Sequence, residues 1–133
     1  MATRQLETAL AIYFEGRDYY SAITLAGAAD EIFGQVLRAQ GEETRVEEIA
    51  KSVAAIYKKL YGTEITPKSV VSRANGARNA LKHWSATQPL VVEFDVLEEA
   101  KDMLERGIAN YWALHRDLTK PMERFEKEVL RAA

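Results

Sequence analysis

Apolar residues recur with the 3.6-residue period of an α-helix along most of this 133-residue chain, and this pattern limits the fold more than any other feature. The clearest example runs from Asp18 to Gln40 and keeps the period for about four turns. Its apolar residues are Ala22, Leu25, Ala26, Ala29, Ile32, Phe33, Val36 and Leu37. A stripe of this kind predicts an amphipathic helix that buries one face in a core.

Other segments show the same period and carry helix start and stop signals. The expected helices are 3–15, 18–40, 45–60, 67–84, 95–114 and a last short one after Pro121. For 45–60 we expect the inner face to be Ile49, Val53, Ile56, Tyr57 and Leu60. For 95–114 we expect Leu97, Ala100, Leu104, Ile108, Tyr111 and Leu114. The strand-like run 90–94 is expected to be an extended linker, because nothing else in the sequence would pair with it.

Together these patterns predict an all-α fold in a single domain, 1–133, built as an antiparallel bundle of five to six helices. The chain lacks Cys, which excludes thiol catalysis and disulfides, and its two His are too few for a His-rich metal site, so no cofactor is expected. No stretch has the ~18 uncharged apolar residues of a membrane span. We therefore expect a soluble cytoplasmic protein.

One basic segment stands out in a chain whose formal net charge is −2. Residues 65–92 contain no Asp or Glu, where about four would be expected from the average of the chain. The basic residues of the segment are Lys68, Arg73, Arg78, Lys82 and His83. If this segment is helical, its polar side chains share one arc of about 140°. They are Ser72, Asn75, Arg78, Asn79, Lys82 and His83, and the apolar residues Val70, Ala74, Ala77, Ala80, Leu81 and Trp84 lie opposite.

This polar face has the groups needed to cleave RNA without a metal ion. An imidazole such as that of His83 transfers protons near neutral pH, and a guanidinium such as that of Arg78 stabilises charge on a phosphate. Asn79 would orient the His or donate to a phosphate oxygen. Asn75, Lys82 and Ser72 would bind the RNA. A polar helix face is also what an ordinary solvated helix presents.

The run Arg78-Asn79-Ala80-Leu81-Lys82-His83 resembles the Arg-polar-x3-His signature of HEPN domains. The upstream run 26–31, Ala-Gly-Ala-Ala-Asp-Glu, is similar to the alanine-rich acidic helix that precedes the motif in that family. Asp30 and Glu31 could pair with the basic helix, but from the pattern we favour a place at the boundary of the core for Asp30 and in solvent for Glu31. The resemblance implies a homodimer with the two motif helices face to face. It also implies a composite site that uses Arg78 and His83 of both copies, with Asn79 in support.

Two classes of function follow. The first is a metal-independent endoribonuclease of the toxin, phage-defence or RNA-processing type. The alternative is a non-catalytic RNA-binding or protein-interaction module whose basic helix docks an acidic partner. An antitoxin or a nucleotidyltransferase is the partner that the resemblance suggests. The sequence specifies neither the RNA target nor the pathway.

Overall fold

A computed structural model describes residues 1–82 and 95–132, and every regular element within these ranges is helical. The elements are α1 (Ala2–Glu15), α2 (Tyr19–Ala39), α3 (Arg45–Tyr61), α4 (Pro67–Ala74), α5 (Gly76–Lys82), α6 (Val96–His115), α7 (Lys120–Phe125) and a π-helical turn, η1 (Glu126–Leu130). The predicted all-α fold class is confirmed for this part of the chain. The strand-like run 90–94 lies outside the described residues.

The ends of the helices follow from local sequence signals. Side chains of four N-cap residues accept backbone N–H groups of the first turn, at Asp18, Thr44, Thr66 and Asp95. Thr44 and Glu47 form a full capping box at the start of α3. Gly16 and Gly62 end α1 and α3 in the left-handed conformation, with φ of 77° and 67°. The helix starts expected at 18, 45, 67 and 95 and the ends expected at 15 and 60 therefore agree with the structure to within one residue.

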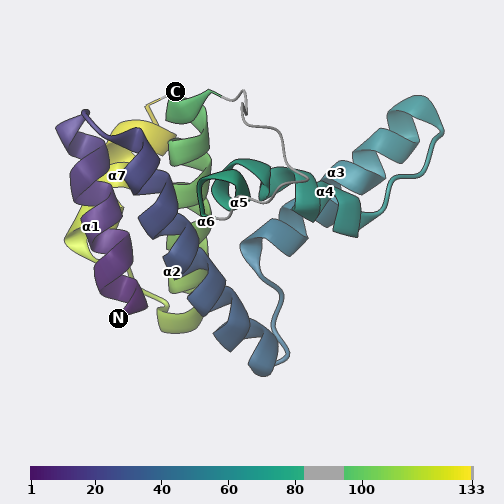
Figure 1. Ribbon diagram of the computed structural model, residues 1–133. Coiled ribbons are helices and arrows are strands. Elements are labelled where there is room, and N and C mark those ends of the chain that lie inside the picture. The colour runs from purple at the N-terminus through teal and green to yellow at the C-terminus, as the bar shows by residue number, and fades with distance from the viewer. Residues whose placement is uncertain (83–94, 133) are drawn as a thin grey trace.

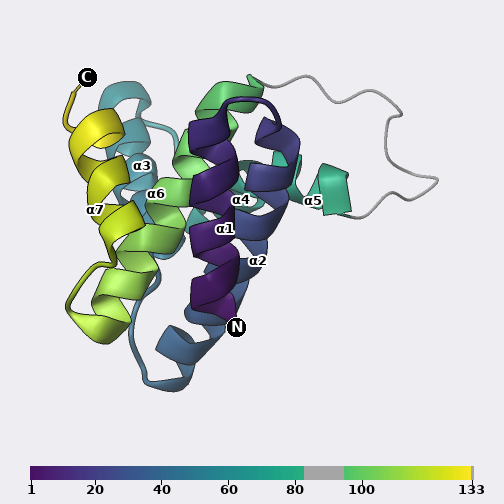
Figure 2. The ribbon, with the colours of Figure 1, turned by 90° about the vertical axis from the view of Figure 1, so that its left-hand side faces the viewer.

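Helices α1, α2, α6 and α7 form a bundle around the apolar core (Figure 2). Its large, fully buried side chains include Leu6, Leu10, Ile23, Leu37, Met103, Leu104, Met122 and Phe125. Helices α1 and α6 approach closely at Gly107, where an added Cβ would lie 2.9 Å from Leu6 Cδ1. On α6 the expected inner residues Ala100, Leu104, Ile108 and Tyr111 are buried, whereas Leu97 in the first turn is exposed.

Helices α3 and α4 form an arm that extends away from the bundle (Figure 1). Only the start of α3 reaches the bundle, where Val46 and Ala50 are buried. The expected inner face of α3 is wrong for most of its length. Val53, Ile56, Tyr57 and Leu60 are exposed, and Ile49 is half-buried. The reason is tertiary: beyond Ala50, α3 packs against the short helix α4 instead of against the bundle.

The expected single helix 67–84 is also wrong, because it is interrupted at Asn75. Asn75 has a ψ of −1°, and the two halves remain joined by hydrogen bonds from Asn75 N–H to Val71 O (3.0 Å) and from Asn79 N–H to Asn75 O (2.9 Å). Helix α4 packs on α3, whereas α5 packs on α2, so the interruption lets the two halves of the segment pack on different helices. The described residues therefore form seven α-helices rather than five to six. In this part of the chain no helix is long and apolar enough to cross a membrane.

Candidate functional site

The helical pattern suggested that Arg78 of α5 faces solvent. In the structure its side chain instead lies across α2. Its side chain is only 13% exposed. Its aliphatic stem covers Gly27, where an added Cβ would lie 2.5 Å from Arg78 Cδ. Its guanidinium Nη1 donates to Asp30 Oδ2 at 3.3 Å. Gly27 and Asp30 are three residues apart and therefore share one face of α2. Together they form the seat of Arg78: Gly27 lies under its aliphatic stem and Asp30 binds its guanidinium.

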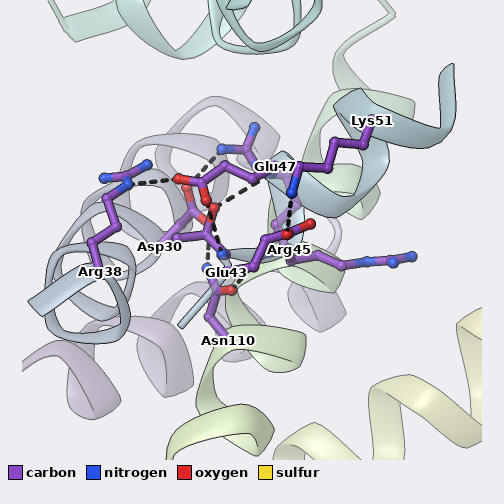
Figure 3. Close-up of polar contacts among 9 residues, drawn as sticks. Asp30, Arg38, Glu43, Arg45, Glu47, Lys51 and Asn110 are labelled. Atoms are coloured by element: carbon purple, nitrogen blue, oxygen red, sulfur yellow. Dashed lines mark hydrogen bonds and ion pairs between the residues drawn. The ribbon is translucent and has the colours of Figure 1, made fainter. Parts of the chain in front are cut away.

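Asp30 is the centre of a buried polar cluster that joins four helices. It is 4% exposed and accepts hydrogen bonds from Arg106 Nη2 at 2.7 Å and Asn110 Nδ2 at 2.9 Å, both from α6. Asn110 Oδ1 in turn accepts the backbone N–H of Arg45 at 2.8 Å, which fixes the start of α3 (Figure 3). The sequence-based placement of Asp30 at the boundary of the core is therefore wrong. Helices α2, α3, α5 and α6 all depend on this one carboxylate.

The charges in the cluster do not balance. One carboxylate, Asp30, faces two guanidinium groups, those of Arg78 and Arg106. Burial raises the pKa of the Asp30 carboxyl above its ordinary value, and the charges of Arg106 and Arg78 act in the opposite direction. Arginine stays protonated throughout the physiological range. The three groups thus carry an excess positive charge when Asp30 is ionised, and a larger one when it is not.

A cavity of about 250 Å³ opens beside the cluster. Its charged lining consists of Arg38, Arg78, Arg106, Asp30 and Glu31. Three buried polar atoms of residues that line it have no hydrogen-bond partner among residues 1–82 and 95–132: Asn75 Oδ1, Arg78 Nε and Arg106 Nε. Buried polar atoms are normally paired, so these three mark a place with unused hydrogen-bonding capacity. Arg38 is paired with Glu47, which lies outside the lining, at 2.7 Å. The lining itself combines three arginines and two carboxylates with free polar atoms, which suits a small anionic group.

The predicted site residues are only partly brought together. Asn75 and Arg78 line the cavity. Ser72 and Asn79 are exposed on α4 and α5, where they remain accessible to a ligand. Lys82 is the last residue of α5, and its side chain is not among those that the structure describes. His83 follows the last residue of α5 and lies outside the described residues, as does Trp84. Leu81, expected on the apolar side, is 37% exposed.

Sequence reasoning missed Gly27, Arg106 and Asn110, and it misplaced Asp30. A signal was present on α2, because Asp30 shares the helix face of Ala26, Ala29, Phe33 and Leu37, all of which are buried. A carboxylate in such a stripe indicates a buried partner. On α6, Arg106 and Asn110 follow Met103 at spacings of three and four residues, so they continue the inner face of that helix.

The comparisons with known proteins add no further information, since no protein-family model, curated protein or solved structure matches this chain. In the part of the chain that the structure describes, no group of three or more His, Asp or Glu side chains is placed to hold a metal ion.

Proposed function

We propose that this chain is a HEPN-like domain that binds single-stranded RNA along α4 and α5 and cleaves it without a metal ion. The observation that carries the proposal is the seat of Arg78. Gly27 and Asp30 of α2 hold the motif arginine at the edge of a cavity with excess positive charge. A guanidinium fixed in this way is suited to stabilising charge that develops on a phosphate, because it needs no reorganisation during the reaction.

The chemistry would use the 2′-hydroxyl of the RNA as nucleophile. His83 would transfer protons, Arg78 would stabilise the charge on the phosphate, and Asn79 would support either group. Asn75, Lys82 and Ser72 would bind the RNA backbone. The exposure of Ser72 and Asn79 supports this part of the proposal, since an RNA strand must reach them. The resemblance to HEPN domains implies a homodimer in which Arg78 and His83 of two copies share one composite site.

Incubation of single-stranded RNA with the protein in EDTA tests the proposal. We expect cleavage products that end in a 2′,3′-cyclic phosphate, because the 2′-oxygen attacks its own phosphodiester. DNA of the same sequence should remain intact. His83→Ala and Arg78→Lys should each lower the cleavage rate by about 10²-fold or more. Lys82→Ala should mainly weaken binding and reduce its salt dependence.

Arg4→Ala is the matched control, because Arg4 is an exposed basic residue of α1, which is outside α4 and α5, and it does not line the cavity. It should retain full cleavage. Circular dichroism of every variant separates loss of chemistry from loss of fold. Cleavage of DNA, cleavage that requires a divalent metal ion, or full activity in His83→Ala would contradict the proposed mechanism.

One observation favours the non-catalytic alternative. Arg78 is largely buried and bonded to Asp30, as a purely structural arginine would be. In that case α4 and α5 would serve as a docking surface for RNA or for an acidic protein, such as an antitoxin or a nucleotidyltransferase. RNA binding without any cleavage by the wild-type protein would decide for this alternative.

A further inference from the structure

The second distinctive surface of the molecule is the end of the arm, residues 56–61 of α3, here called the arm tip. Its four large apolar side chains are exposed: Ile56 at 57%, Tyr57 at 37%, Leu60 at 69% and Tyr61 at 68%. Lys58 and Lys59 lie among them. Within the described residues, Lys58 pairs only with the exposed Glu64, at 2.9 Å, and Lys59 has no ion pair. The tip is therefore an apolar surface with positive charge, and such surfaces typically mark an interaction site.

A groove of complementary character lies at the opposite end of the same helix. It measures about 570 Å³ and is bounded by the start of α3, by α6 and by η1. Its apolar lining includes Ile108, Leu118, the half-exposed Trp112 and Leu130. Five glutamates and three arginines line it, so its net charge is negative. Of these glutamates, Glu42 has no ion pair within the described residues.

We propose that the arm tip of one copy occupies the groove of a second copy, and that two such contacts form a symmetric dimer. Both surfaces combine exposed apolar side chains with charge, and the charges are opposite. The geometry of α3 favours a closed pair. Its 17 residues span about 25 Å, with the groove at the N-terminal end and the tip at the C-terminal end. Two antiparallel α3 helices related by a two-fold axis would place each tip at the other copy's groove.

The seam between the two α3 helices would use residues that the bundle leaves uncovered. Val53, Ile56 and Leu60 follow the spacing of three and four residues by which helices pair along a narrow apolar stripe. All three are exposed in the single chain. The proposal concerns the arm and the groove, so it holds or fails independently of RNA cleavage at Arg78 and His83.

Sedimentation of the full chain over a range of concentrations is the first test. We expect concentration-dependent self-association that Leu60→Asp weakens by at least about tenfold, whereas any pairing of the motif helices, which does not use the arm, should persist in this variant. Val36→Asp is the control, because Val36 is an exposed apolar residue of α2 outside both surfaces and should leave association unchanged. A wild-type chain that stays monomeric at high concentration, or a Leu60→Asp variant that dimerises as well as the wild type, would overturn the proposal.

Exchanging the charges of the arm tip and of the groove tests more directly whether these two surfaces meet. The tip variant Lys58→Glu/Lys59→Glu and the groove variant Glu42→Lys/Glu48→Lys should each dimerise poorly alone, because each places like charges at both contacts. When mixed, they should form a heterodimer, since both contacts then join opposite charges. Circular dichroism confirms that each variant is folded. Failure of the mixture to associate would overturn the assignment of the groove as the site of the tip, whatever the outcome of the RNA assay.

Discussion

Helices α2 and α3 carry similar apolar stripes, yet the stripe is mostly covered on α2, where Val36 is its one exposed residue, and largely exposed on α3. On α2 the stripe meets α1 and α6, and Ala22, Ala26, Ala29, Phe33 and Leu37 are buried. On α3 only Val46 and Ala50 are buried, because the rest of the helix leaves the bundle with α4 as its neighbour. Periodicity therefore predicts that a helix forms, but whether its apolar face is buried depends on how many helices lie beside it.

The Asp30 cluster lies between these two regions and joins α3 and α5 to the bundle. We expect Asp30→Ala to lower the free energy of unfolding by about 3–5 kcal/mol, since it leaves the guanidinium groups of Arg78 and Arg106 buried without their carboxylate. Urea denaturation measures this. Asp117→Ala, at an exposed aspartate, is the control and should change the value by less than about 0.5 kcal/mol. An Asp30→Ala variant as stable as this control would show that the cluster does not hold the elements together.

A pair of leucine truncations compares the bundle with the arm directly. Leu104 is fully buried in the bundle, and Leu60 is 69% exposed on the arm. We expect Leu104→Ala to lower the free energy of unfolding by about 2–5 kcal/mol, because it leaves a cavity. Leu60→Ala should change it by less than about 0.5 kcal/mol. Both values come from denaturation at a concentration at which the chain is monomeric. Equal losses at the two positions would mean that the arm is packed as tightly as the bundle.

Two glycine substitutions test the seat of Arg78 with a smaller expected effect. Gly27→Ala should lower the free energy of unfolding by about 1–3 kcal/mol, because the added Cβ would collide with the stem of Arg78. Gly76→Ala, at the start of α5, should raise it by up to about 1 kcal/mol, since an added Cβ there meets no atom within 4 Å and alanine favours the helix. Urea denaturation of both variants measures these changes in the free energy of unfolding. Stabilisation by Gly27→Ala would contradict the described path of the Arg78 side chain.

The parts of the fold that depend on neighbouring residues could be predicted from the sequence. Asp18, Thr44, Thr66 and Asp95 each cap a helix through the residues that follow within three positions, so the signal is local. The interruption at Asn75 could not be predicted in the same way. It arises because α4 packs on one helix and α5 on another, and that choice depends on tertiary contacts.

The candidate site also has one part that local sequence signals predict and another that depends on tertiary contacts. Arg78 was recognised from its place in a short motif, which is local information. Its partner Asp30 lies 48 residues earlier in the chain, and Arg106 lies 76 residues after Asp30. A pairing of Asp30 with the basic helix could be considered from the sequence, but the pattern gave no reason to prefer it over a boundary position, and it gave no sign of Arg106. The expected exposure of Arg78 was wrong for this reason.

The central claim is that RNA binds at the cavity beside Arg78 and along the exposed side of α4 and α5. Addition of a short 2′-O-methyl RNA, which cannot be cleaved, to isotope-labelled protein tests it by NMR. We predict that the largest shifts fall on the backbone amides of residues 72–82 and on the Arg78 Nε–H, which has no partner among the described residues. Residues 56–61 of the arm tip should remain unchanged. Shifts that map to the arm tip or to the groove instead, or no shifts at saturating RNA, would contradict the account.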